Sequence, residues 1–215
     1  KVQKGKKVVV IGGGPGGMEA ARSAAIAGHE VMLFEKENVL GGQLKSAATP
    51  DFKSQLRELV QWYKHQMEIL HVDVHLNTEI AVDSPELEKA DTIIIATGAA
   101  PVIPKIKGIE NAIDIITAHL NQDKLKGNKI IYCGGGLSAC DSALETAMEG
   151  KNTTIIEMLD EVAINDHFIN KAALIPMLKQ HNVEIYTNHK VLEITPEGVR
   201  TVSKDGNDVF IKGDT

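Results

Sequence analysis

The first residues whose types and spacing could do chemistry are three glycines, Gly12, Gly14 and Gly17. A glycine at the first position permits a tight turn, one at the second lets a diphosphate approach the backbone, and one at the third lets a helix pack closely on a strand. The free N–H groups of the helix N-terminus then point at the anion. Glu35 follows 18 residues after the last glycine and could accept hydrogen bonds from a ribose. This pattern predicts a dinucleotide site.

The same pattern recurs further along the chain at one constant offset. The run that starts at Val8 aligns without a gap on the run that starts at Ile130, 122 positions later. The matched pairs are Gly12 with Gly134, Gly14 with Gly136, Gly28 with Gly150 and Glu35 with Glu157. Ala139 stands at the third glycine position, where close packing is the only requirement. A single offset over a strand, a helix and a second strand indicates a duplicated unit, so we expect two dinucleotide sites.

The residues that follow each acidic position differ between the two copies. After Glu35 the chain reads KENVLGGQLK, in which Gly41 and Gly42 offer backbone without side chains beside the phosphate-binding turn. Glu157 is followed by MLDEVA, which adds acids and no arginine. Because negative side chains repel a ribose 2′-phosphate, we expect the second copy to take NADH in preference to NADPH.

Each copy must form a strand, a helix and a second strand to hold these residues. The β-branched run 8–11 predicts a buried strand, the Ala-rich run 17–27 predicts a helix that ends at Gly28, and 31–35 predicts the next strand. In the second copy the corresponding elements are a strand over 129–133, a helix over 138–148 capped at Gly150, and a strand over 153–157. Strands joined by helical crossovers form a parallel sheet. The expected fold class is α/β with two Rossmann-like domains.

Segments outside the repeat read as scaffold and linker. We expect a helix over 51–70, a strand over 72–76, a shorter helix over 172–180 and a hairpin around Asp205 and Gly206. Residues 99–108 contain Pro101 and Pro104 and interrupt both periodicities, which favours a linker. We therefore expect one domain over 1–103 and a second over 109–215.

Composition restricts the class of protein. The chain has 215 residues, of which 43% are hydrophobic and 24% charged, as in globular proteins. Its net charge of -6 argues against a nucleic acid or an acidic membrane surface as the main partner. No apolar run approaches the length of a membrane span, and we expect a cytoplasmic protein. The two cysteines make no disulfide framework, and we expect both to be buried packing residues.

Several runs together resemble the two-dinucleotide-binding flavoproteins of the pyridine nucleotide-disulfide oxidoreductase superfamily. These runs are GGGPGG, FEKENVLGGQL, ADTIIIATG, CGGGLSACDSALE and IIEMLDEVA, and they extend over essentially the whole chain. GGQL followed by the helix over 51–70, together with IEMLDEVA, is similar to the C-terminal region of the 2,4-dienoyl-CoA reductase and NADH:flavin oxidoreductase family, which is enoate reductase-like and includes trimethylamine dehydrogenase. The resemblance implies that the second domain is inserted in the first.

The resemblance also implies the cofactors and the site residues. The first domain would bind FAD and the second NADH, hydride would pass from NADH to FAD, and a preceding barrel domain of the same parent chain would carry FMN and an iron-sulfur cluster and reduce an enoyl or enone substrate. The FAD residues would be Gly12, Gly14, Pro15, Gly16, Gly17, Glu35, Lys36, Gly41, Gly42, Gln43, Leu44, Ile80, Ala96, Thr97 and Gly98. The NADH residues would be Gly134, Gly135, Gly136, Leu137, Ser138, Ala139, Glu157 and Met158. The two cofactors supply the reactive atoms, so no catalytic side chain and no metal site are expected.

The final residues repeat an earlier run and then stop. KADTIII continues into a strand after Asp91, whereas KGDT ends the chain just after Asp214. In the similar family this second run leads into the segment that completes the FAD domain. We therefore expect a truncated polypeptide that lacks the last part of the FAD site and binds FAD poorly.

Two other functions fit the same residues. One copy could hold ADP or a similar nucleotide in a module without catalysis, or the chain could be an electron-input subunit like the small chain of glutamate synthase. Disulfide oxidoreductase chemistry is disfavoured because Cys133 and Cys140 lie on either side of the phosphate turn. The sequence leaves open whether the chain forms a homo-oligomer.

Overall fold

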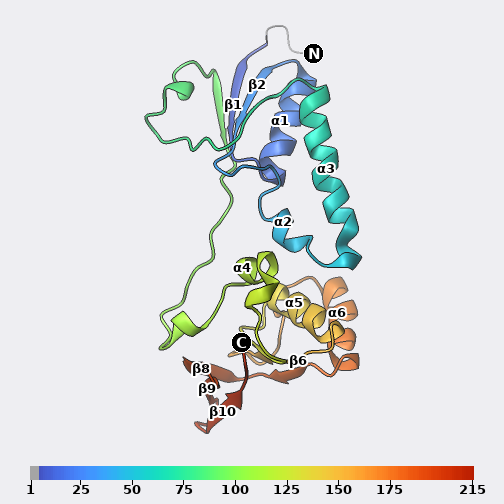
Figure 1. The fold of residues 1–215 in the computed structure, drawn as a ribbon, viewed down its shortest axis with the longest axis vertical. Coiled ribbons are helices and arrows are strands. Elements are labelled where there is room, and N and C mark those ends of the chain that lie inside the picture. The colour runs from blue at the N-terminus through green and yellow to red at the C-terminus, as the bar shows by residue number, and fades with distance from the viewer. Residues whose placement is uncertain (1–4) are drawn as a thin grey trace. The chain divides into compact units, whose positions relative to one another are not determined.

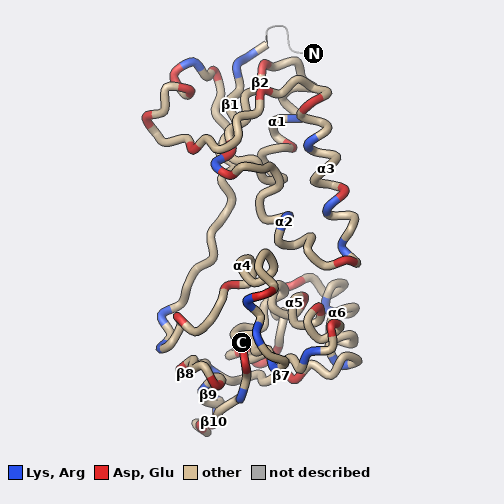
Figure 2. Tube along the Cα trace, in the orientation of Figure 1, with Lys and Arg blue, Asp and Glu red and all other residues tan. Residues whose placement is uncertain are grey.

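The structure is a computed structural model that describes residues 5–215. It divides into two compact units, of which the first ends at Ala100 and the second begins at Pro101. Each unit contains a parallel sheet with helices packed against it. Acidic and basic residues are interspersed along the trace of each unit (Figure 2).

The first unit is built on a parallel sheet of four strands in the order β3-β2-β1-β4. The strands are β1 (Lys7–Ile11), β2 (Glu30–Phe34), β3 (Asp73–His75) and β4 (Thr92–Ile95). In the register of the sheet Val8 lies between Val31 and Thr92. Because β1 is central and covered on both faces, its β-branched side chains are buried. This burial places the carboxyl end of β1 in the middle of the sheet edge.

Two helices pack against this sheet, α1 (Pro15–Ala27) and α3 (Ser54–Ile69), and Figure 1 shows them side by side. In α1 the proline occupies the first helical position, and Gly28 ends the helix with φ 98°. In α3 the buried Met67 and the partly buried Tyr63 pack in one cluster with residues of α1 and the sheet, whereas the buried Val60 lies beside Gly41. The short helix α2 (Leu44–Ala47), a 3-10 turn at Asp51–Lys53 and another at Pro85–Leu87 complete the unit.

The second unit repeats the design with three parallel strands in the order β5-β6-β7. These are β5 (Lys129–Cys133), β6 (Asn152–Ile156) and β7 (Glu184–Tyr186), and the helices are α4 (Ile115–Leu120), α5 (Leu137–Met148) and α6 (Phe168–Gln180). The core side chains come from α5, α6 and β6 and include Cys140, Leu144, Ile155 and Leu178. Two 3-10 turns, Ile109–Asn111 and Gln122–Lys124, flank α4.

An antiparallel sheet follows in the same unit, in the order β10-β9-β8. Its strands are β8 (His189–Thr195), β9 (Gly198–Ser203) and β10 (Asp208–Lys212). The turn between β9 and β10 contains Gly206 at φ 84°, which confirms the predicted hairpin. Helix α6 begins four residues earlier than its predicted start at 172. Its first turn places Phe168 and Ile169 at the surface, so the amphipathic pattern used for the prediction is lost there.

The two units make matching hydrogen bonds at the amino ends of β1 and β5. The Asp91 carboxylate accepts a hydrogen bond from Lys7 N at 2.8 Å, and the Asp214 carboxylate accepts one from Lys129 N at 2.9 Å. Thr215 O then accepts from Ile131 N at 2.8 Å, so the last residue lies along β5. The duplication inferred from the aligned glycines therefore extends to the aspartates that start the next segment.

No helix within residues 5–215 combines the length and the apolar composition that crossing a bilayer requires.

Candidate dinucleotide-binding sites

The first candidate site lies in the turn between β1 and α1. Gly12 has φ 106°, and a Cβ added there would collide with the carbonyl of Ala96 at the end of β4. Gly12 N donates to Phe34 O at 2.7 Å, which ties the turn to the end of β2 as well. Only glycine combines this backbone conformation with so close an approach.

The third glycine of the motif brings the helix against the turn. A Cβ added to Gly17 would overlap the carbonyl oxygen of Gly12, whereas one added to Gly16 would meet no heavy atom within 4 Å. Gly16 and Gly17 lie in the first turn of α1, where N–H groups have no partner within the helix. The positive end of the helix dipole and these donors favour an anion at this place.

Glu35, the acidic residue of the first copy, accepts a backbone hydrogen bond from the turn between β1 and α1. Glu35 is only 7% exposed, and its Oε2 accepts from Gly13 N at 2.6 Å while its Oε1 accepts from Glu37 N at 2.9 Å. A carboxylate oxygen accepts two hydrogen bonds. Each oxygen therefore retains an acceptor site, which is what a pair of ribose hydroxyls requires.

The loop with two consecutive glycines packs on the turn, backbone against backbone. Gly41 N donates to Gly13 O at 2.9 Å, and a Cβ added to Gly42 would lie 2.8 Å from Gly14 Cα. Both residues have positive φ, 130° for Gly41 and 51° for Gly42. These glycines therefore allow a second stretch of bare backbone beside the phosphate-binding turn.

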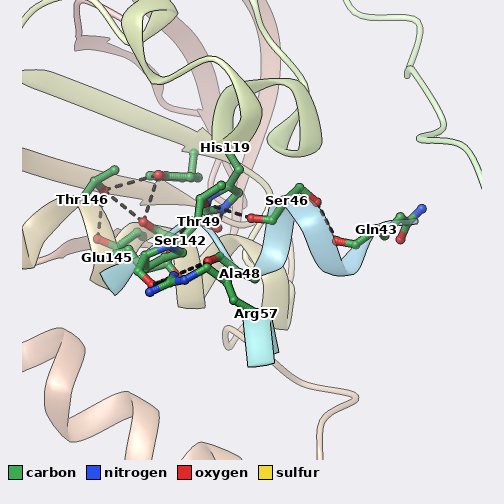
Figure 3. A network of polar contacts seen from close by, with 12 residues as sticks. Gln43, Ser46, Ala48, Thr49, Arg57, His119, Ser142, Glu145 and Thr146 are labelled. Carbon is green, nitrogen blue, oxygen red and sulfur yellow. Dashed lines mark hydrogen bonds and ion pairs between the residues drawn. The ribbon is translucent and has the colours of Figure 1, made fainter. Parts of the chain in front are cut away.

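The following residues anchor this loop within the first unit. Gln43 Nε2 donates to Ala99 O at 2.7 Å, and Ser46 Oγ donates to Gln43 O at 2.9 Å (Figure 3). Arg57 of α3 donates to Ala48 O at 2.6 Å. The loop from 41 to 48 is thus held between α3 and the segment that follows β4.

The other predicted residues of the first site lie around the same end of the sheet. Thr78 N donates to Glu35 O at 2.9 Å, which brings the segment that leads to Ile80 beside the acid. Lys36 is exposed next to Glu35. The residues that directly follow β4 are Ala96, Thr97 and Gly98, and those at the start of α1 and α2 are Gly14, Pro15 and Leu44.

The second candidate site repeats this construction between β5 and α5. Glu157 is 9% exposed, and its carboxylate accepts from Gly135 N at 2.6 Å and from Leu159 N at 2.8 Å. Ala163 N donates to Gly135 O at 2.7 Å, as Gly41 N does to Gly13 O. Ala163 adopts φ 51°, a conformation uncommon without glycine.

The second turn is more open than the first. Gly134 has φ 112°, but a Cβ added to it or to Gly136 would meet no heavy atom within 4 Å. Ala139 already carries the Cβ that would collide at Gly17, so the second turn is wider at this position. A cavity of about 990 Å³ adjoins the turn and is lined there by Gly134, Gly136, Ser138 and Ala139. Leu137 is 40% exposed beside them, and Met158 follows Glu157 at the surface.

The two cysteines differ in environment. Cys140 is completely buried, and its Sγ donates to Gly135 O at 3.4 Å beneath the turn. Burial, with smaller contributions from the Glu157 and Asp141 charges, raises the pKa of the Cys140 thiol to about 11. The prediction of a buried packing residue is therefore confirmed for Cys140. It is wrong for Cys133, which is exposed because it ends β5 at the sheet edge.

A polar network fixes α5, whose first turn forms the second site. His119 Nε2 lies 2.8 Å from Ser142 Oγ, which links α4 to α5 (Figure 3). Tyr132 OH donates to Ser142 O at 3.0 Å, and Thr146 Oγ1 lies 3.2 Å from Thr153 Oγ1. These side chains join α5 to β5 and to β6. Their separation in sequence left no signal that could have predicted the network.

Sequence reasoning missed Gly13, at the centre of the first site, although it predicted the corresponding Gly135 in the second. Gly13 and Gly135 each donate an N–H to the acid of their copy, and a Cβ on either would collide with that acid or with an apolar neighbour. Their alignment at the repeat offset was a usable signal, because both copies have three consecutive glycines.

Known proteins match almost the whole length of the chain. The profile of the family described as pyridine nucleotide-disulphide oxidoreductase matches residues 6–215. A bilirubin reductase of Mediterraneibacter gnavus is 37% identical over 203 residues, which are 94% of this chain and 32% of that protein. An NADH oxidase of Thermoanaerobacter brockii is 35% identical over 214 residues, 96% of this chain and 33% of that protein.

A solved structure shows the same fold. The structure of a 2-naphthoyl-CoA reductase superposes with a TM-score of 0.88 and 33% identity, over 99% of this chain and 32% of that one. The chain thus spans about a third of the length of these relatives.

Proposed function

Because the chain belongs to the pyridine nucleotide-disulphide oxidoreductase family, we propose that its first unit binds FAD, that its second unit binds NADH, and that hydride passes from NADH to FAD. The observation that carries the proposal is the duplicated bond between acid and turn. Glu35 and Glu157 each hold the N–H of the middle glycine at 2.6 Å and keep acceptor sites for a ribose. Two such sites in one chain suit a donor and an acceptor dinucleotide.

The proposal assigns FAD to the first domain, which we place over 1–103, because this copy has the additional backbone surface. Gly41 and Gly42 pack against the turn, and the segment after β4 closes on Gly12. A flavin dinucleotide has a large isoalloxazine end that needs such neighbouring backbone. The second domain, which we place over 109–215, has the more open turn and the adjoining cavity, which suit a nicotinamide cofactor that binds and leaves.

The roles proposed for the residues are binding and orientation. The first turns of α1 and α5 would hold the two diphosphates, Glu35 and Glu157 would hold the riboses, and Gln43, Leu44 and Thr97 would orient the flavin. Bound flavin and nicotinamide themselves supply the hydride chemistry. The protein contributes alignment of the two rings, and no side chain has to transfer a proton.

NADH is the proposed nicotinamide cofactor because the run that follows Glu157 contains acids and no arginine. The relatives are about three times longer than this chain. We extend the proposal to a further domain of the parent that carries FMN and an iron-sulfur cluster, receives the electrons and reduces an enone-type substrate. The reductases of bilirubin and of 2-naphthoyl-CoA among the similar proteins support the substrate reduction in this extension.

The test measures flavin and nicotinamide separately. The purified full-length parent protein is reconstituted with FAD, titrated with NADH without oxygen, and followed by flavin absorbance. We expect a yellow protein that bleaches with NADH. In Glu157→Gln we expect weaker NADH binding with FAD unchanged, whereas Glu197→Gln, at an exposed position of the same unit, serves as the matched control. A chain that binds neither cofactor, or binds FAD without being reduced by NADH, contradicts the proposal.

A further inference from the structure

An open groove of about 540 Å³ lies beside the second candidate site. One wall is the run that follows Glu157, from Met158 to Asp160, and the other wall carries Lys190 of β8 and Lys204, which follows β9. We call this feature the lysine groove. It brings two cations next to a run that has none of its own.

Backbone hydrogen bonds fix the lysine groove to Glu157. Leu159 N donates to the Glu157 carboxylate at 2.8 Å, and His189 N donates to Glu157 O at 2.9 Å. Asn188 N donates to Leu159 O at 2.7 Å, and Lys204 N donates to Asn188 O at 2.9 Å. The two lysines are therefore placed relative to the ribose-binding carboxylate by the fold itself.

The charge in the lysine groove is positive. Lys190 and Lys204 are exposed, and within residues 5–215 neither forms an ion pair. Asp160 is the acid in its lining. The Glu157 carboxylate accepts two backbone N–H groups, which offset part of its charge. Two lysines against one aspartate give the lining of the groove itself a net positive charge, beside the Glu157 carboxylate.

This placement assigns a ligand group to the groove. A phosphate on the ribose 2′-oxygen would project from the hydroxyl that Glu157 is proposed to bind, toward the residues that follow it. Lysine is a common phosphate ligand and acts as a point charge. Resting on the proposed binding of a nicotinamide dinucleotide here, we propose that Lys190 and Lys204 bind the 2′-phosphate, so that the site takes NADPH as well as NADH.

The inference changes what the sequence alone indicates. The lysines follow Glu157 by 33 and 47 residues, so the run MLDEVA read by itself favours NADH only. The pairing of β8 with β9 and their attachment to the end of β6 bring them to the same groove. The two lysines that distinguish a ribose with a 2′-phosphate from one without come from the antiparallel sheet, Lys190 in β8 and Lys204 just after β9.

The test compares ligands that differ only in the 2′-phosphate. Calorimetric titrations of the chain with NADP⁺ and NAD⁺ are run for the wild type, for the double variant Lys190→Gln with Lys204→Gln, and for Lys179→Gln, an exposed lysine on α6, as the control. Adenosine 2′,5′-bisphosphate and its 3′,5′ isomer have the same charge and test the position of the phosphate.

We expect wild type and control to bind both NADP⁺ and NAD⁺. The double variant should lose about tenfold or more for NADP⁺, as for two charged hydrogen bonds, and stay within about twofold for NAD⁺. The 2′,5′ isomer should bind more tightly than the 3′,5′ isomer. NAD⁺ binding with no measurable NADP⁺ binding, or NADP⁺ binding that the double variant leaves unchanged, overturns this inference alone. A chain that binds neither overturns the proposed function as well.

Discussion

The substitution Gly17→Ala tests the closeness of α1 to the phosphate-binding turn. A Cβ at Gly17 would overlap the carbonyl oxygen of Gly12, although ordinary contact begins at 3.4 Å, so the helix and the turn would have to separate by more than an ångström. The same change at Gly16 provides the matched control, because a Cβ there meets nothing within 4 Å. Both residues lie in the first turn of α1, and neither has a positive φ.

The magnitude follows from two opposing effects. Overpacking costs about 1–3 kcal/mol, whereas replacing glycine by alanine in a helix gains up to about 1 kcal/mol. For Gly17→Ala we expect the first unit to lose about 1–2 kcal/mol of unfolding free energy. For Gly16→Ala, where only the second effect acts, we expect a gain of between zero and about 1 kcal/mol.

The assay uses the chain's single tryptophan, Trp62. It lies on α3, with the Arg22 guanidinium of α1 at 5.5 Å from its ring, so its fluorescence reports on the packing of these two helices in the first unit. With an m-value of about 1.5 kcal/mol per M of urea, the midpoint of Gly17→Ala should fall by roughly 1 M. Equal midpoints for Gly17→Ala and wild type, or equal losses for both variants, would refute the reasoning about close packing.

Three further outcomes follow from the same geometry. Glu35→Gln has only one acceptor oxygen, so it leaves one of the two backbone N–H groups that Glu35 binds without a partner. We expect the free energy of unfolding in urea to fall by about 1–3 kcal/mol and FAD binding to weaken. Unchanged stability would show that this carboxylate does not hold the turn. Gly12→Ala and Gly134→Ala both place alanine at positive φ, but only the first also brings its Cβ against a backbone carbonyl. Gly12→Ala should therefore lower the free energy of unfolding, followed by circular dichroism, by about 1–3 kcal/mol more than Gly134→Ala. Equal losses would contradict this. The raised pKa of Cys140, about 11, against about 8.5 when unfolded, means that its contribution to stability is complete below pH 8.5 and is lost as pH rises toward 11. Mass spectrometry after iodoacetamide at pH 8 should find Cys140 unmodified until urea is added, and fast labelling of the folded chain would show that the thiol is accessible.

The amino-acid sequence by itself determined the architecture of this protein and the positions of its turns. The spacing of Gly12, Gly14 and Gly17 and the offset of 122 predicted two strand, helix and strand units, which are present as parallel sheets. These predictions succeeded because the signals are local: a buried strand, a glycine turn and an Ala-rich helix each follow from neighbours in the chain. The longer start of α6 was missed because its first turn faces outward.

Only the tertiary structure decided which distant groups meet at the two turns. Strand pairing brings the acid of each copy onto the N–H of a glycine 22 residues earlier, and backbone bonds set Ala163 where the first copy has Gly41. The same pairing carries Lys190 and Lys204 to the run after Glu157. Such contacts depend on which strands pair although they are far apart in sequence, and the side-chain pattern within one strand does not identify its partner.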